Sequence, residues 1–310
     1  MVSCANGTDA LQLALMAQGL PKGSKIIVPA FTYIAPVEAI QLMGYEPVYC
    51  DIDTDTFNCT AETIANVYSA DVSAVFPIHL FGQLCDMQEI SAWADKNNCF
   101  VIEDNAQSIA AEKNLANKAS VITTSFFPTK NLGCFGDGGA VLTQDANLAA
   151  KLRQMANHGQ AGKKYFHEVV GMNSRLDAIQ AAVLQVKLKH LDQSIEKRQW
   201  VANFYNAALR KIDGIQIPKN NGHHTYHQYT LQVDETRRDG LQEFLAKNNI
   251  PSSVYYPIPA YHQKAYRKDN IHLPNTEILC KTVLSLPMHT ALDDTTLSYI
   301  CDSIHSYFKK

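Results

Sequence analysis

Two charged residues follow apolar runs that are typical of buried strands. Lys130 comes shortly after Pro128, which interrupts the run over residues 121–127. Asp104 directly follows the run over residues 100–103. A lysine kept out of water loses its proton more readily, and its free amine can then attack a carbonyl carbon to form an imine. The sequence therefore offers Lys130 as a nucleophile and Asp104 as a carboxylate that could pair with a cation.

The position of Asp104 suits a ligand site, because ligands of open α/β sheets bind outside the carboxyl ends of the strands. A carboxylate there could pair with a protonated pyridine nitrogen, and the positive ring is the electron sink of pyridoxal 5′-phosphate (PLP) chemistry. Two ordinary interpretations stay open: Asp104 could cap the next helix, and Lys130 could be a solvated loop lysine. Glu103 is a weaker candidate for a paired acid, because adjacent strand residues point to opposite faces.

A phosphate could bind at the small-residue turn over residues 6–8, which opens a predicted helix over residues 8–18. Backbone N–H groups at a helix N-terminus attract anions; Gly7 lies in this turn, and Thr8 could add a hydroxyl donor. The Ser125 hydroxyl lies on the predicted strand before the lysine, where it could also reach a phosphate. Such small polar residues are common helix caps, so the turn alone does not establish a phosphate site.

Tyr33 follows a predicted strand over residues 25–28, and its flat side chain could stack on a cofactor ring. A core or turn aromatic is the ordinary alternative. The glycine-rich run over residues 133–139 is not a P-loop, because it lacks the Gly-Lys-Ser/Thr ending that binds nucleoside phosphates. No Gly-x-Gly-x-x-Gly follows the first predicted strand, which argues against an NAD-dependent enzyme.

The elements that must position these residues alternate between strand and helix in the first half of the chain. Strand-like runs cover residues 25–28, 47–50, 74–78 and 100–103, and helical patterns cover residues 8–18, 34–43, 60–68 and 87–97. This alternation predicts an α/β fold with a mostly parallel central sheet sandwiched by helices.

A long helical pattern over residues 177–206 could bridge two domains. After it, a strand pattern over residues 228–233 and helical patterns over residues 238–248 and 293–308 indicate a smaller α+β domain. We therefore predict a large ligand-binding domain over residues 1–195 and a small C-terminal domain over residues 196–310.

The composition is that of an ordinary globular protein. The chain has 310 residues, 46% of them hydrophobic and 18% charged, with a net charge of −3. This charge gives no reason to expect a nucleic-acid or membrane partner, and the apolar runs are too short to cross a bilayer. The 8 cysteines are scattered without a Cys-x-x-Cys pair, so we predict no metal site and a cytoplasmic location.

Taken together and in order, these segments resemble the DegT/StrS family of PLP-dependent nucleotide-sugar aminotransferases, which have the type I PLP-transferase fold. Each motif alone is weak, but their joint order is specific and spans nearly the whole chain. The matching segments are residues 6–8, 31–33, 79–83, 103–107, 125–133, 138–140, 158–159, 173–177, 180–182, 255–259 and 284–288.

The resemblance implies a role for each matching residue. Lys130 is implied to hold PLP as a Schiff base and to move the proton between the substrate and the cofactor. Asp104 is implied to pair with the pyridine nitrogen, Gln107 to contact the ring hydroxyl, and Tyr33 to stack on the ring. The implied cofactor-binding set is Gly7, Thr8, Tyr33, Asp104, Gln107, Ser125, Lys130 and Asn173.

The resemblance also implies a homodimer with active sites shared across the interface, because Asn173 matches a residue that reaches the phosphate of the other subunit. Arg175, in the same loop, is implied to help bind substrate. His262 is a further substrate candidate, although relatives often have Leu-His where this chain has Ala260-Tyr261.

The implied reaction moves an amino group from L-glutamate to a nucleotide-linked ketosugar, for polysaccharide, lipopolysaccharide or other glycoconjugate synthesis. The segment Asn173-Ser174-Arg175-Leu176 resembles 3-ketosugar enzymes more than 4-ketosugar enzymes, since the latter more often have Tyr at the second position. The substrate could be a uronate, whose carboxylate Arg175 would pair with. The alternatives are a 4-ketosugar aminotransferase and a non-catalytic or regulatory PLP-binding relative; a sugar dehydratase is disfavoured because Lys130 is present.

Overall fold

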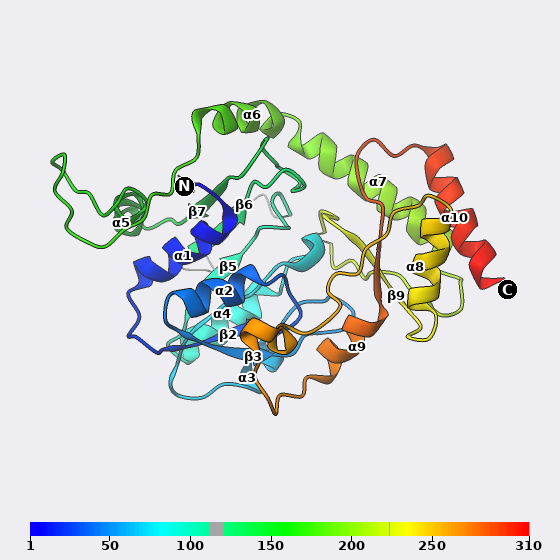
Figure 1. The fold of residues 1–310 in the computed structure, drawn as a ribbon, viewed down its shortest axis with the longest axis horizontal. Helices are drawn as coiled ribbons and strands as arrows, with labels where there is room; N and C mark the ends of the chain where they lie inside the picture. The colour runs from blue at the N-terminus through cyan, green and yellow to red at the C-terminus, as the bar shows by residue number, and fades with distance from the viewer. Residues whose placement is uncertain (112–120, 223, 310) are drawn as a thin grey trace.

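The computed structural model describes residues 1–111, 121–222 and 224–309. A seven-stranded sheet forms the centre of the larger part of the chain (Figure 1), in the order β1-β7-β6-β5-β4-β2-β3. Strands β2 to β6 are parallel, and β7 is antiparallel to both of its neighbours, β1 and β6. The strands are β1 (Val2–Cys4), β2 (Lys25–Pro29), β3 (Glu46–Cys50), β4 (Val72–Val75), β5 (Phe100–Asp104), β6 (Val121–Ser125) and β7 (Gly139–Leu142).

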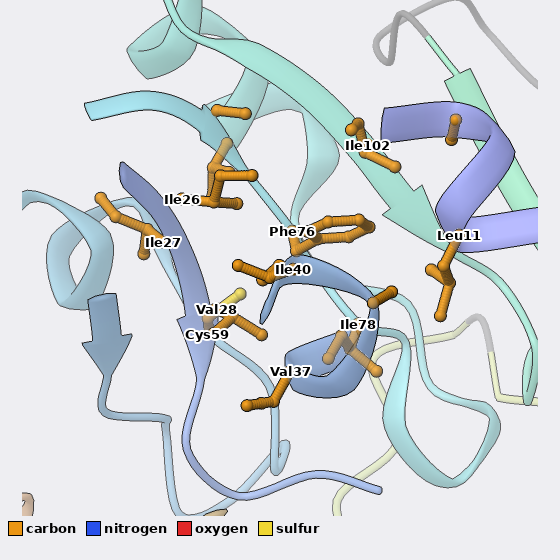
Figure 2. Packing of buried hydrophobic residues seen from close by; sticks show 14 of the residues in the cluster. Leu11, Ile26, Ile27, Val28, Val37, Ile40, Cys59, Phe76, Ile78 and Ile102 are labelled. Atoms are coloured by element: carbon orange, nitrogen blue, oxygen red, sulfur yellow. The ribbon is translucent and has the colours of Figure 1, made fainter. Parts of the chain in front are cut away.

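The sheet is covered on both faces. Every residue of β2 and of β5 except the first is buried, which an open sheet face would not allow. The helices of this part are α1 (Gly7–Gln18), α2 (Ala35–Leu42), α3 (Ala61–Ala65), α4 (Met87–Lys96) and α5 (Ala146–Ala156). Figure 2 shows Ile26 of β2, Ile40 of α2 and Phe76 in one apolar core, and all three are fully buried. The predicted α/β architecture is therefore present.

A smaller part follows, built on a three-stranded antiparallel sheet in the order β10-β9-β8. Its strands are β8 (Ile215–Gln216), β9 (Tyr229–Val233) and β10 (Val283–Leu286), and its helices are α8 (Arg238–Lys247) and α10 (Asp294–Phe308). These elements have a hydrophobic core of their own. Helix α9 (Pro274–Thr282) instead contributes Leu279 and Cys280 to the core of the large sheet. The division at residues 195 and 196 stays a prediction.

The single long helix predicted over residues 177–206 is wrong. The structure has two helices, α6 (Ala178–Leu188) and α7 (Leu191–Leu209), which Figure 1 shows running from the large sheet toward the small one. Backbone bonds from Lys189 to Val186 and from His190 to Lys187 tighten the end of α6 and redirect the chain. None of the helices in the described residues is both long and apolar enough to pass through a membrane.

Candidate active site

A cavity of about 780 Å³ opens at the carboxyl ends of β5 and β6. Asp104 ends β5 and Ser125 ends β6, and the N-terminus of α1 lies beside them on the cavity wall. On the opposite side, segments that lead into and out of the small domain close the cavity with His227 and Tyr256. The cavity thus occupies the position in which open α/β sheets bind ligands.

The N-terminus of α1 is pressed against the end of β6. A Cβ on Gly7 would lie 2.7 Å from the Cβ of Ser125, so this approach is open only to glycine. The Asn6 side chain caps the helix by accepting a hydrogen bond from the N–H of Asp9 at 2.8 Å. The N–H groups of Gly7 and Thr8 precede the first intrahelical bond, so they remain available to an anion beside the Ser125 hydroxyl.

Asp104 presents a buried carboxylate to the cavity. Its side chain accepts a hydrogen bond from the N–H of Ala106 at 2.9 Å. Burial raises the pKa of Asp104, whereas this bond and the charge of Lys130 act in the opposite direction. A buried carboxylate with so few hydrogen bonds is stabilised by a cation, such as a protonated pyridine nitrogen.

Lys130 lies in a tight turn after β6, and its N–H donates to the carbonyl of Phe127 at 2.8 Å. The turn requires Gly133, where a Cβ would lie 2.5 Å from the carbonyl oxygen of Pro128. Burial lowers the pKa of Lys130 below the ordinary 10.5, and the charge of Asp104 opposes this change. The amine is therefore more readily deprotonated than a surface lysine, as imine formation requires.

Gln107 has a fixed orientation. Its Oε1 accepts a hydrogen bond from the N–H of Phe81 at 2.7 Å, and its Nε2 lies 3.5 Å from the hydroxyl of Tyr256. Because the oxygen is occupied by the backbone, the NH₂ group is the part of the amide that is offered to the cavity. This arrangement suits an acceptor such as a ring hydroxyl or its anion.

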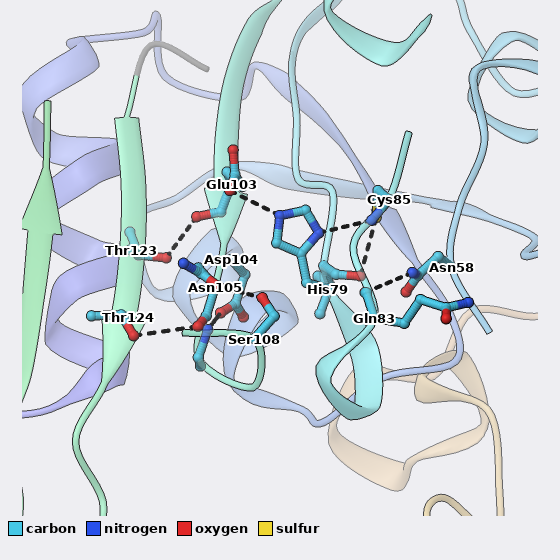
Figure 3. A network of polar contacts seen from close by, with 12 residues as sticks. Asn58, His79, Gln83, Cys85, Glu103, Asp104, Asn105, Ser108, Thr123 and Thr124 are labelled. Atoms are coloured by element: carbon cyan, nitrogen blue, oxygen red, sulfur yellow. Dashed lines mark hydrogen bonds and ion pairs between the residues drawn. The ribbon is translucent and has the colours of Figure 1, made fainter. Parts of the chain in front are cut away.

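A polar network that includes Glu103 supports the carboxyl end of β5 (Figure 3). His79 Nε2 lies 2.8 Å from Glu103 Oε1, and the N–H of Cys85 donates to His79 Nδ1 at 3.0 Å. Because Nδ1 accepts this hydrogen bond, the ring proton is on Nε2, which donates a hydrogen bond to Glu103. The N–H of His79 also donates to the carbonyl of Asp104 at 3.1 Å. Glu103 does not line the cavity, as the alternation of strand side chains predicts.

The remaining predicted site residues divide into two groups. Tyr33 lines the cavity, with its ring centroid 6.3 Å from that of Tyr256. Asn173, Arg175 and His262 are exposed and are not among the described residues that line the cavity. The structure therefore brings together Gly7, Thr8, Tyr33, Asp104, Gln107, Ser125 and Lys130.

The loop that carries Asn173 and Arg175 is anchored by the residue between them. Buried Ser174 donates to Asp9 Oδ2 at 2.6 Å and accepts from the N–H of Ala5 at 3.0 Å. Arg175 donates to Asn157 Oδ1 at 3.0 Å. The loop is therefore fixed to the start of α1, and its two candidate residues are not among the described residues that line the cavity.

Two further residues of the cavity wall, Tyr256 and His227, are not in the predicted set. Tyr256 lies within the matched segment over residues 255–259, so its position was available from the sequence but its role was not. His227 lies just before β9 and outside every matched segment. His227 reaches the cavity because its segment pairs with residues 81–82 through the N–H groups of Gln228 and Thr225.

The sequence profile of the DegT/DnrJ/EryC1/StrS aminotransferase family matches residues 1–305. The chain belongs to this family. It is 42% identical to the UDP-2-acetamido-2-deoxy-3-oxo-D-glucuronate aminotransferase of Pseudomonas aeruginosa, over 98% of this chain and 85% of that protein. It is 40% identical to the UDP-N-acetyl-3-dehydro-alpha-D-glucosamine 3-aminotransferase of Acidithiobacillus ferrooxidans, over 98% of this chain and 83% of that protein.

A solved structure gives the same result for the fold. NtdA of Bacillus subtilis, crystallised with the bound cofactor PMP, superposes with a TM-score of 0.95 at 29% identity, over 100% of this chain and 73% of NtdA. The predicted type I PLP-transferase fold, aminotransferase activity and PLP cofactor are thereby confirmed. The cavity fits this cofactor, because a glycine-containing helix terminus, a buried carboxylate and a partly buried lysine all line it.

Proposed function

We propose that this aminotransferase moves an amino group from L-glutamate to C3 of a nucleotide-linked 3-ketosugar. The observation that carries the proposal is the placement of Lys130 and Asp104 on one cavity in a chain whose relatives are named for 3-oxo sugar substrates. A UDP-linked ketosugar is the favoured acceptor of the amino group, because both of these relatives are named for UDP-linked sugars.

Each residue of the cavity has a task in this reaction. When bound, PLP supplies a positively charged ring that withdraws electrons from the bonds broken and formed at the substrate carbon. Asp104 would keep the ring nitrogen protonated, and Gln107 would donate from its NH₂ group to the ring oxygen. Gly7, Thr8 and Ser125 would hold the phosphate. The amine of Lys130 would hold the cofactor covalently and, when free, would carry the proton to and from the substrate carbon.

Charge in the cavity supports a contribution from a second subunit. Lys130 is the only lysine or arginine among the described residues that line the cavity. Glutamate has two carboxylates, and a uronate substrate adds another, so a further cation is needed. We propose that Asn173 and Arg175 of a partner subunit enter the cavity, where Asn173 contacts the phosphate and Arg175 pairs with a substrate carboxylate. His262 stays a candidate substrate residue near Gln263, which does line the cavity.

Exposed apolar side chains along α6 support a homodimer. Ile179 is 75% exposed, Val186 is 61% exposed and Leu188 is 58% exposed, and nearby Phe135 is 74% exposed. Large apolar side chains grouped in this way indicate a surface that is covered by a partner. Because α6 begins directly after the loop with Arg175, pairing through α6 places that loop close to the neighbouring chain.

A reconstitution experiment tests the reaction and the shared site together. Lys130→Ala and Arg175→Ala chains, each inactive alone, are mixed under conditions that exchange subunits, and the release of 2-oxoglutarate with UDP-linked 3-ketosugars is measured. If the sites are shared, recovery of up to about one quarter of wild-type activity is expected. Random exchange makes half of the dimers mixed, and one of the two sites in each mixed dimer has both Lys130 and Arg175. No recovery, with both variants folded and exchanging, would contradict the shared site.

A panel of substrates tests which nucleotide-linked ketosugar the enzyme aminates. UDP- and dTDP-linked 3-ketosugars, with and without a C6 carboxylate, are compared with a 4-ketosugar. If Arg175 pairs with a uronate, Arg175→Lys should raise the KM of the uronate more than that of the neutral sugar. Preference for the 4-ketosugar would favour the alternative aminotransferase. Failure of glutamate and all sugars to react with a PLP-loaded chain would favour a regulatory protein. A cytoplasmic role in polysaccharide synthesis is part of the proposal, because nucleotide sugars are the precursors used there.

A further inference from the structure

The residues that precede β9 are bonded to the backbone that orients Gln107. The N–H of Thr225 donates to the carbonyl of Gly82 at 2.8 Å, and the N–H of Gln228 donates to the carbonyl of Phe81 at 3.2 Å. Phe81 is also the residue whose N–H donates to Gln107 Oε1. The segment before β9 is therefore in direct contact with the residues that hold the amide of Gln107.

The side chain of Thr225 adds a contact to Gln107 itself. Its Oγ1 lies within hydrogen-bonding distance of two carbonyl oxygens, that of Gly82 at 3.3 Å and that of Gln107 at 3.4 Å. Thr225 is 1% exposed, so its hydroxyl has no solvent to bond to and depends on these two partners. The hydroxyl thus joins the backbone of Gln107 to that of Gly82, next to the bond between the Gln107 side chain and Phe81.

Gly82 makes room for this contact. It adopts a φ of +102°, and a Cβ there would lie 2.6 Å from Thr225 Oγ1 and 2.8 Å from the backbone N of His227. A larger residue at this position would have to displace either the threonine side chain or the backbone that leads to His227, which lines the cavity. The close approach of the two segments therefore holds the hydroxyl of Thr225 where it reaches both carbonyl oxygens.

Thr225 is also joined to the turn that carries Lys130. Asn131 directly follows the lysine, and its Nδ2 donates to the carbonyl of Thr225 at 3.4 Å. Lys130 and Gln107 both line the cavity, whereas Thr225 and Asn131 are not among the described residues that line it. Thr225 thus supports two cavity residues without meeting a bound molecule: Gln107 through its hydroxyl, and the turn of Lys130 through its carbonyl.

We propose that Thr225 is a positioning residue whose hydroxyl fixes the backbone of Gln107 relative to that of Gly82, and so keeps the NH₂ group of Gln107 directed at the ring oxygen of bound PLP. The inference rests on the proposed contact of Gln107 with that oxygen. Gln107 Oε1 keeps its bond to the N–H of Phe81 only while the two backbones keep their spacing. Without the hydroxyl the spacing varies, and the amide then bonds to the ring oxygen less well.

The test compares PLP with 3-deoxypyridoxal 5′-phosphate, an analogue that lacks the ring hydroxyl. Each is titrated into the full chain freed of cofactor, and its Kd is measured by absorbance. Thr225→Val keeps the shape of the side chain but loses the hydroxyl, so it should raise the Kd for PLP about fivefold, the effect of one hydrogen bond. The Kd for the analogue should change much less. Thr225→Ser keeps the hydroxyl and should stay close to the wild type.

Thr230→Val is the matched control for a purely structural effect. Thr230 is also 1% exposed, and its hydroxyl lies 2.8 Å from that of Ser285 on the neighbouring strand β10. Neither of these two residues is among the described residues that line the cavity. Thr230→Val should therefore lower thermal stability, as Thr225→Val should, but leave the Kd for PLP unchanged.

The outcomes separate this inference from the proposed role of Gln107. An equal rise in both Kd values of Thr225→Val, or no rise for PLP, would overturn the inference. If Thr225→Val does not fold, Thr225→Ser and Thr225→Ala decide, because an equal preference for PLP over the analogue in these two variants also overturns it. If Gln107→Glu discriminates between PLP and the analogue as well as the wild type does, the proposed contact of Gln107 is contradicted, and this inference with it.

Discussion

Gly7 and Ser125 meet so closely that a Cβ on the glycine would lie 2.7 Å from the serine Cβ and 3.1 Å from its hydroxyl oxygen. This contact joins the N-terminus of α1 to the carboxyl end of β6. It places two free backbone N–H groups beside a hydroxyl, which is the arrangement that an incoming phosphate can use. The spacing of these donors depends on the absence of a Cβ atom at Gly7.

Gly7→Ala should therefore weaken PLP binding through its phosphate. The added methyl group must push the first turn of α1 away from Ser125, so we expect a rise in the Kd for PLP of about tenfold or more, or about 1.4 kcal/mol. Titration with pyridoxal, which lacks the phosphate, is the matched control and should change much less. Equal losses for PLP and pyridoxal would contradict a phosphate site at this contact.

Gln107 allows the two ends of one amide to be tested separately. Gln107→Leu leaves the N–H of Phe81 without its acceptor and should lower the free energy of unfolding by about 1–3 kcal/mol. Gln107→Glu keeps that acceptor but loses the NH₂ donor, so it should retain more stability and still bind PLP more weakly. Urea unfolding and PLP titration measure the two effects. Unchanged PLP affinity in the Gln107→Glu variant would argue against contact with the ring oxygen.

Much of this site was predictable because its residues lie at the ends of strands. Asp104 and Ser125 end β5 and β6, and the carboxyl ends of parallel strands meet at one edge of a sheet. The alternation of strand side chains also correctly separated Glu103 from the cavity. Local sequence and the rules of parallel sheets therefore account for Asp104 and Ser125, whereas Gln107 was predicted only through the resemblance to the family.

The parts that were missed depend on contacts between distant segments. His227 reaches the cavity only because the segment before β9 pairs with residues 81–82, and no local pattern encodes that pairing. The break between α6 and α7 was missed for a similar reason: the apolar spacing continues across Lys189 and His190 although the backbone turns there. Helical spacing alone does not locate a change of direction between two helices.

Substitutions of His79 test how much its polar network stabilises the end of β5 that carries Asp104. His79→Phe would leave both the carboxylate of Glu103 and the N–H of Cys85 without their partners. Because both groups are buried, we expect a loss of about 3 kcal/mol in the free energy of unfolding. His79→Gln can both donate and accept, so it should lose less. Urea unfolding compares the variants, and equal stability of His79→Phe and the wild type would show that the network contributes little.

Lys130 should give the cofactor-free chain a stability that depends on pH. Burial lowers its pKa in the folded chain below the ordinary 10.5, so the folded state binds fewer protons than the unfolded state between these two values. Stability should therefore rise with pH across this window, by at most about 1.4 kcal/mol per pH unit, and level off above it. Below the lowered pKa, the folded chain carries the full penalty of a buried ammonium.

Lys130→Met removes the buried amine and with it this dependence. Urea unfolding from pH 7 to pH 10 should show a flatter profile for Lys130→Met and higher stability than the wild type at the lower end. Lys22→Met, at an exposed position, is the control and should keep the wild-type profile. Asp104→Asn should shift the rise to lower pH, because the charge of Asp104 opposes the lowering of the lysine pKa. If Lys130→Met and wild-type chains have parallel profiles, the amine is not buried in the folded protein.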